Sequence, residues 1–283
     1  MDVAALIDAE VDQGTRRALF ARVRQHTGIA MPDRKWALLH GRLRRRLQAL
    51  SIGDYRDYLS LLESSDDEVA RFVDLVTTNE TSFFRTPRIW EYLQRSFLPA
   101  WVAQHGAAPL RVWSAASSSG EEVYSLAMTF EEFRRTHPVF RWRIVATDIS
   151  QAMVQAAQSG QYSGRNADAF QRLHPDMAAR YFESVDDKLC ARASLRAGIS
   201  FRQHNLFRAL IEPDRFDLVL LRNVLIYFDE ADQQRVLELA RSRMAAEGTL
   251  IIGESESLGR LATGFVFHEP LIYRNGGDHA RHG

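Results

Sequence analysis

The feature that most constrains the fold is an alternation of strand-like and helix-like segments that begins near residue 108. Apolar runs occupy residues 110–116, 143–148, 216–221 and 248–253, and segments of helical period start at Glu121, at Ser150 and at about Glu230. Strands that alternate with helices in this way predict a parallel sheet with helices on both faces. We therefore expect a Rossmann-like α/β domain over most of the chain.

The end of the sequence departs from this repeat. Extended apolar segments at residues 265–267 and 271–273 lie close together, with no helical pattern between them. Class I methyltransferases end their sheet on such an antiparallel strand, whereas dinucleotide dehydrogenases usually continue the β/α repeat. The sequence thus predicts a methyltransferase-like sheet with a terminal antiparallel strand, and it argues against a Rossmann oxidoreductase.

The first quarter of the chain is helical in pattern throughout. Trp36, Leu39, Leu43 and Leu47 fall on one helical face, and apolar residues in 69–76 repeat the same spacing of three or four. No strand pattern interrupts this region, so we expect a small all-α domain ahead of the α/β domain.

These patterns divide the chain into consecutive parts. We expect a helical N-terminal domain at residues 1–76, a linker and first helix at 77–107, a catalytic domain at 108–275 and a polar tail at 276–283. Residues 161–203 do not fit a plain β/α repeat. Residues 180–185 and 199–202 resemble short strands, so this stretch is predicted to be a small antiparallel β insertion.

Composition excludes several classes of protein. The 36 basic and 36 acidic side chains cancel, so no global charge draws the chain to nucleic acid or membrane. The N-terminus lacks the features of a secretory signal, and no apolar run approaches the roughly 18 residues that span a bilayer. Cys190 is the single cysteine, and the nine histidines lack metal-ligand spacing. We expect a soluble cytoplasmic protein without a metal.

The loop after the first strand is the expected place for a nucleotide-like cofactor, because ligands of α/β sheets lie beyond the carboxyl ends of the strands. The loop reads SAASSSGEE at residues 114–122, with one glycine and no GxGxxG pattern. By itself it is equally consistent with a tight turn that binds nothing. The acidic residues that follow would repel a pyrophosphate but suit an ammonium and a sulfonium. This favours S-adenosylmethionine over NAD.

Asp148 ends the second strand, where α/β cofactor sites use a carboxylate to accept hydrogen bonds from ribose hydroxyls. The alternative is that Asp148 caps the helix that starts near Gln151. Ser150 could cap that helix equally well, so we favour the cofactor role.

Several strings, in order and spacing, resemble the CheR family of chemotaxis receptor methyltransferases along nearly the whole chain. They are TTNETSFFR at residues 77–85, the turn at 114–124, ATDI at 146–149, HNL at 204–206 and RNVLIYF at 222–228. The resemblance implies methylation of glutamate side chains on chemoreceptors, with S-adenosylmethionine converted to S-adenosylhomocysteine. Val123 departs from the pattern, since a proline commonly follows the GEE turn. The alternative function is a non-catalytic module that binds the cofactor and a receptor.

The resemblance also implies which residues line the cofactor site: Asn79, Thr81, Arg85, Glu122, Asp148, Asn205, Leu206, Arg222 and Asn223. Taken singly, these could be ordinary linker, turn or strand-end residues, and only the joint pattern favours binding. Whether Glu121 or Glu122 faces the cofactor stays open, because adjacent helical residues point about 100° apart.

Arg85 and Tyr227 are the candidate catalytic residues because they lie in the two most specific strings. A glutamate carboxylate, with an unperturbed pKa of about 4.3, is already ionised near pH 7, so no general base is needed. We hypothesise that Arg85 and Tyr227 orient the incoming carboxylate by hydrogen bonds. The alternatives are that Arg85 holds the linker and that Tyr227 is a core aromatic.

A basic run in the helical domain is the candidate receptor-binding surface. It contains Arg42, Arg44, Arg45 and Arg46, preceded by Arg34 and Lys35, with no acidic residue between. Such a run is usually a solvated helix face, and nucleic acid is a competing partner. The resemblance supplies an acidic receptor helix that this face could attract. The insertion lacks the glycine-rich loop of relatives that bind a receptor C-terminal pentapeptide, so we expect a monomer that acts without that tether.

Overall fold

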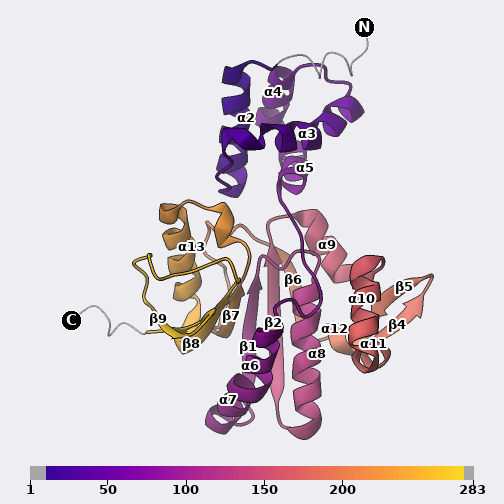
Figure 1. The fold of residues 1–283 in the computed structure, drawn as a ribbon, viewed down its shortest axis with the longest axis vertical. Helices are drawn as coiled ribbons and strands as arrows, with labels where there is room; N and C mark the ends of the chain where they lie inside the picture. Colours follow the sequence, from indigo (N-terminus) through magenta and orange to yellow (C-terminus); the bar gives the residue numbers. More distant parts are fainter. Residues whose placement is uncertain (1–10, 277–283) are drawn as a thin grey trace.

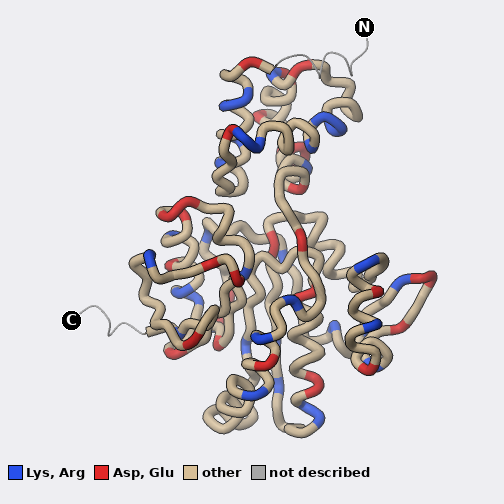
Figure 2. Tube along the Cα trace, in the orientation of Figure 1, with Lys and Arg blue, Asp and Glu red and all other residues tan. Residues whose placement is uncertain are grey.

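The computed structural model describes residues 11–276, and these form an upper helical domain and a lower α/β domain joined by a linker (Figure 1). Residues 1–10 and most of the expected polar tail, residues 277–283, lie outside the described part. Lys and Arg alternate with Asp and Glu over both domains, in line with the balanced composition (Figure 2). Within residues 11–276, every helix is too short or too polar to cross a bilayer.

The N-terminal domain consists of helices α2 (Gln13–Thr27), α3 (Trp36–Leu50), α4 (Tyr55–Ser64) and α5 (Asp66–Val76), with a short 3-10 turn, η1, at Asp33–Lys35. Side chains of Asp12, Asp54 and Ser65 accept hydrogen bonds from backbone N–H groups in the first turns of α2, α4 and α5. These caps satisfy donors that a helix start leaves unpaired. The predicted apolar face of α3 is buried against the other helices.

The linker leads into a nearly continuous helix made of α6 (Pro87–Tyr92), a π-helical turn η2 (Leu93–Phe97) and α7 (Leu98–His105). The α/β domain then alternates as predicted: β1 (Pro109–Ala115), α8 (Glu121–Thr136), β2 (Arg141–Asp148), α9 (Gln151–Ser159), β7 (Phe216–Leu221), α13 (Glu230–Ser242) and β8 (Met244–Ile252). Strand residues alternate between two cores. Val112 packs on the side of α8, and Trp113 packs on the side of α13.

The main sheet has the strand order β6-β2-β1-β7-β8-β10-β9, in which β6 spans Ile199–Gln203. Neighbouring strands from β6 to β8 are parallel, while β10 (Ile272–Asn275) is antiparallel to both β8 and β9 (Phe265–Glu269). The predicted Rossmann-like sheet with a terminal antiparallel strand is confirmed.

The insertion contains the predicted small antiparallel sheet, but its strands differ from those expected. It is built from β3 (Gln161–Tyr162), α10 (Arg165–Leu173), α11 (Pro175–Tyr181), β4 (Phe182–Val185), β5 (Lys188–Ala191) and α12 (Ala193–Arg196). The small sheet has the order β3-β5-β4. It projects to one side of the main sheet (Figure 1).

The assignment of residues 199–202 to this insertion was wrong. They belong to β6 (Ile199–Gln203), the edge strand of the main sheet, which pairs in parallel with β2 from Ile144↔Ile199 to Asp148↔Gln203. A short half-buried strand has the same pattern in an edge position as in a hairpin, so periodicity could not separate the two. Gly198 allows the pairing, because a Cβ there would lie 2.4 Å from the Trp142 ring.

Candidate functional site

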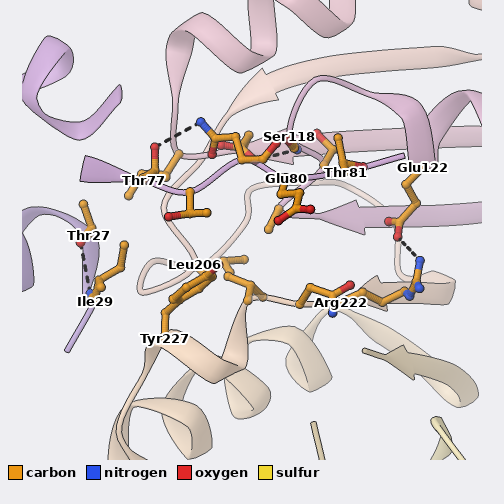
Figure 3. A pocket seen from close by; sticks show the side chains of 18 of the residues that line it. Thr27, Ile29, Thr77, Glu80, Thr81, Ser118, Glu122, Leu206, Arg222 and Tyr227 are labelled. Atoms are coloured by element: carbon orange, nitrogen blue, oxygen red, sulfur yellow. Dashed lines mark hydrogen bonds and ion pairs between the residues drawn. The ribbon is translucent and has the colours of Figure 1, made fainter. Parts of the chain in front are cut away.

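A pocket lies at the carboxyl ends of β1, β2, β6 and β7, where open α/β sheets bind ligands. Its strand-end wall consists of Ala116–Ser118, Glu122, Asp148, Ile149, His204–Phe207, Arg222–Val224, Tyr227 and Phe228. Its linker wall consists of Thr77–Ser82 and Arg85, together with Thr27 and Ile29 from the end of α2. Figure 3 shows Thr77, Glu80 and Thr81 of the linker wall on one side of the pocket and Leu206, Tyr227 and Arg222 of the strand-end wall on the other. Every residue predicted to bind the cofactor or to act in catalysis lines this pocket.

The loop between β1 and α8 is held in an unusual backbone conformation. Ala116 and Ser118 have φ values of 64° and 50°, in the left-handed region that side chains disfavour. Gly120 has a φ of 95°, and a Cβ there would lie 2.9 Å from that of Ala157. The single glycine is thus required where α8 starts, and the small residues before it bring backbone to the pocket.

Asp148 holds this loop from the neighbouring strand. Its Oδ2 accepts a hydrogen bond from Ser118 N at 2.8 Å, and its Oδ1 accepts one from Ser150 N at 2.9 Å. The cap of α9 is Ser150, whose hydroxyl accepts from Met153 N. Burial raises the pKa of Asp148, against the opposing effect of the backbone N–H donors. The carboxylate therefore borders the pocket and is not the cap of α9.

Glu122, and not Glu121, lies on the pocket. Its Oε2 pairs with Arg222 Nη1 at 2.7 Å, and its Oε1 accepts from Ser114 Oγ at 2.8 Å. Arg222 also donates to Thr86 Oγ1 at 2.8 Å. Glu121 is buried away from the pocket, where burial raises its pKa. Of the two adjacent glutamates, Glu122 is therefore the one that α8 turns toward the pocket.

The loop after β7 brings the remaining strand-end residues to the pocket. Asn223 has a left-handed φ of 56°, and the 3-10 turn η3 (Leu225–Tyr227) follows it. Tyr227 lines the pocket, and its carbonyl oxygen accepts a hydrogen bond from Ala30 N at 2.9 Å. The helical domain therefore contacts the same loop that carries the candidate catalytic tyrosine.

The linker wall is joined by direct hydrogen bonds to the strand-end wall and to the insertion. Ser118 Oγ donates to the carbonyl of Asn79 at 2.9 Å, and Asn166 of the insertion donates to the carbonyl of Thr81 at 2.8 Å. Arg85 Nη1 donates to the Glu80 carbonyl at 3.2 Å, so part of its guanidinium braces the linker. Its side chain also lines the pocket.

Some pocket residues were not predicted. Ser117 Oγ and His204 Nε2 are buried and lack a hydrogen-bond partner within the described chain. Both follow strand ends, and that position was the available signal. Burial lowers the pKa of His204. Thr27 and Ile29 come from the helical domain, and nothing in the local sequence indicated that they would approach a site some 50 to 200 residues away along the chain.

These features fit S-adenosylmethionine. Three carboxylates, those of Glu80, Glu122 and Asp148, border the pocket, small residues bring backbone close, and a buried hydroxyl on Ser117 that has no partner in the described chain is available to a polar ligand. Ile149, Leu206, Phe207 and Tyr227 supply apolar surface for a flat ring system. Residues 11–276 contain no His, Cys, Asp and Glu cluster able to hold a metal ion.

Some arginines of the predicted basic surface of α3 make contacts within the helical domain. Arg42 donates to the carbonyls of Val76 and Thr77 at the end of α5, and Arg46 pairs with the buried Glu68. Arg44 is half-buried and Arg45 is exposed. Arg42 and Arg46 thus have partners on a helix that the sequence pattern could not place, and the assignment of the four arginines to receptor binding stays a prediction.

Comparisons with known proteins agree with this architecture. Residues 16–77 match the family model described as "CheR methyltransferase, all-alpha domain", and residues 79–269 match "CheR methyltransferase, SAM binding domain". The chain is 33% identical over 264 residues to a "Chemotaxis protein methyltransferase" of Escherichia coli K12, covering 91% of this chain and 89% of that protein. It is 32% identical over 243 residues to "Chemotaxis protein methyltransferase 1" of Pseudomonas aeruginosa, covering 83% and 86%.

Proposed function

The chain belongs to the CheR methyltransferase family, and from that premise we propose that it methylates glutamate side chains of chemoreceptors to give glutamyl methyl esters. One observation carries the proposal. The same pocket is lined by Asp148, Glu122 and Arg222 of the strand-end wall and by Arg85 of the linker. It combines a cofactor site with a cationic group suited to a carboxylate substrate.

S-adenosylmethionine, when bound, supplies a methyl group activated by its sulfonium. We assign Asp148 to the ribose hydroxyls, because a carboxylate at the end of the second strand suits that task. Glu122, which lines the same pocket in a pair with Arg222, is assigned to the ammonium group of the methionyl part, for which its carboxylate oxygens are acceptors. Asn79, Thr81, Asn205, Leu206 and Asn223 complete the proposed cofactor set, and Ser117 is added by its unpartnered hydroxyl.

The chain's task in the reaction is alignment. A glutamate carboxylate is ionised near pH 7 without help, and both reacting groups lose charge as the methyl is transferred. Arg85 orients the carboxylate through charge-assisted hydrogen bonds, and the Tyr227 hydroxyl donates a second one. The apolar surface around Tyr227 keeps the reacting groups poorly solvated, which favours the less charged transition state.

Receptor recognition is assigned to the helical domain. Arg45 is exposed on α3, whereas Arg42 and Arg46 act mainly by fixing α3 to α5. Arg45→Glu is expected to lower receptor methylation several-fold without changing affinity for S-adenosylhomocysteine, because charge at an interface rim chiefly affects encounter. Equal methylation by the variant would remove this surface from the proposal.

The hairpin of the insertion supports tether-independent binding. Its strands β4 and β5 are joined by Asp186 and Asp187 alone, with φ values of 48° and 58°. A two-residue turn of this kind is tight and leaves no long loop to enclose a peptide. We further propose that the protein acts as a monomer in the cytoplasm, that residues 1–76 recognise the receptor and that residues 108–275 carry catalysis.

The test is transfer of a labelled methyl group from S-adenosylmethionine to membranes that contain a chemoreceptor. The proposal expects receptor-bound label that alkali releases as methanol, because methyl esters are base-labile. Alkali-stable label would mean that a different atom is methylated. Binding of S-adenosylhomocysteine without any transfer would favour the non-catalytic module instead.

A further inference from the structure

Glu256, in the segment after β8, is a buried carboxylate that does not line the pocket. Its residue is 8% exposed, and both of its oxygens face backbone N–H groups. Oε1 accepts from Val224 N at 2.8 Å and from Leu225 N at 2.8 Å. Oε2 accepts from Asn223 N at 2.9 Å and from Gly253 N at 2.6 Å. One side chain thus accepts hydrogen bonds from the backbones of two strand-end loops and holds them together.

The loop that Glu256 holds is the one that bears pocket residues at both ends. It starts at Arg222, passes through Asn223 and reaches Tyr227 at the end of η3. Asn223 is in the left-handed region, with a φ of 56°. Such a conformation costs a residue on the order of 1 kcal/mol and persists only where surrounding contacts enforce it. Hydrogen bonds from consecutive N–H groups to a carboxylate are contacts of that kind.

Gly253 shows how closely the two loops approach. A Cβ on Gly253 would lie 2.7 Å from Asn223 Nδ2, 2.8 Å from Asn223 N and 2.8 Å from Glu256 Oε2. Any side chain at residue 253 would therefore push the Asn223 loop away from the carboxylate. The glycine and the glutamate together define one fixed position for the loop.

We propose that Glu256 is a positioning residue for the methyl transfer, which holds the loop after β7 so that Asn223 and Tyr227 face the cofactor and the substrate carboxylate. The inference rests on the proposed function, because it assigns those two residues to cofactor and substrate. Glu256 acts only through the loop, since it contacts backbone N–H groups and does not border the pocket.

The test uses Glu256→Gln in the full chain. The amide keeps the size of the side chain but turns an NH₂ group toward N–H donors, so part of the loop loses its acceptor. The dissociation constant for S-adenosylhomocysteine is expected to rise at least tenfold, and kcat for receptor methylation to fall at least tenfold. Both are measured at a temperature where circular dichroism shows a folded protein. Glu256→Asp keeps the charge on a shorter stem and should fall between Gln and wild type.

Glu254→Gln is the matched control, because Glu254 is exposed two residues away and should leave both constants unchanged. Wild-type constants in folded Glu256→Gln, with only a lower melting temperature, would reduce Glu256 to a structural role and overturn the inference. If Glu256→Gln does not fold, the same two constants are measured in Glu256→Asp and Gly253→Ala. Wild-type values of the dissociation constant and of kcat in both variants would then overturn the inference. Failure of the proposed function is recognised separately, because the wild type itself would then transfer no methyl group.

Discussion

The two walls of the pocket are built in different ways. The strand-end wall is fixed by buried charged groups that bind backbone or each other, as Asp148 does with Ser118 and as Glu122 does with Arg222. The linker wall is held by donors to its backbone carbonyls that come from both domains, such as Ser118 Oγ to the Asn79 carbonyl and Arg42 Nη1 to the Thr77 carbonyl. The strand-end wall therefore depends on buried charge, and the linker wall on the hydrogen bonds that its backbone accepts from both domains.

The largest effect on the free energy of unfolding is expected from a substitution in the strand-end wall. Glu122→Gln leaves Arg222, which is 6% exposed, without its charged partner. Breaking a buried ion pair by removing one partner costs about 3 to 5 kcal/mol. Denaturant unfolding should report a loss of that order. Glu63→Gln, which breaks the surface pair with Arg22, should cost less than about 1 kcal/mol. Equal losses in the two variants would mean that the Glu122–Arg222 pair stabilises the strand-end wall no more than a surface pair would.

Arg85→Ala tests the linker wall. Loss of a charge-assisted contact to the substrate should lower kcat for receptor methylation at least tenfold, which corresponds to about 1.4 kcal/mol in the barrier. The free energy of unfolding should change little, because within residues 11–276 the Arg85 guanidinium donates only to the Glu80 carbonyl. Arg88→Ala, at an exposed residue of α6, is the control and should behave as wild type. Near-normal turnover by Arg85→Ala would exclude a catalytic role for Arg85.

Asp74→Ala tests how the helical domain is attached above the pocket. Asp74 Oδ1 accepts from Ser150 Oγ at 2.6 Å, next to the start of α9. Losing this contact should cost about 1 kcal/mol, or about 2 to 4 °C in melting temperature. Glu183→Ala, at an exposed position of β4, should change the melting temperature far less. An unchanged melting temperature for Asp74→Ala would mean that other contacts suffice to attach the domain.

The smallest expected effect is on the pH dependence of the free energy of unfolding. Burial lowers the pKa of His204 below its usual 6.5, so the unfolded chain binds a proton more readily than the folded one. The contribution of His204 to stability is therefore complete above about pH 6.5 and is lost as the pH falls. His204→Gln should reduce the loss of stability between pH 7.5 and 5.5 by less than about 1 kcal/mol. If the pH dependence of stability is the same in His204→Gln as in the wild type, His204 is exposed to solvent in the folded chain.

The sequence predicted the strand-end wall better than the linker wall, for a physical reason. Residues such as Asp148 and Glu122 directly follow strands whose period can be read locally, and parallel strands bring their carboxyl ends to one edge. Asn79 and Arg85 were found only through the family resemblance, because a linker has no period.

Features that depend on distant partners were missed. Thr27 and Ile29 reach the pocket from α2, Arg42 and Arg46 are bound by α5, and residues 199–202 pair with β2 and not with the insertion. Each depends on packing between segments far apart along the chain, which a local sequence pattern does not indicate.

The most direct measurement of the central claim is a calorimetric titration of the full chain with S-adenosylhomocysteine, beside Asp148→Asn. We predict one binding site in the wild type and at least tenfold weaker binding in the variant, because the amide replaces one acceptor oxygen with a donor. Absence of binding in the wild type, or equal affinity in the two proteins, would contradict a cofactor site built on the strand-end wall.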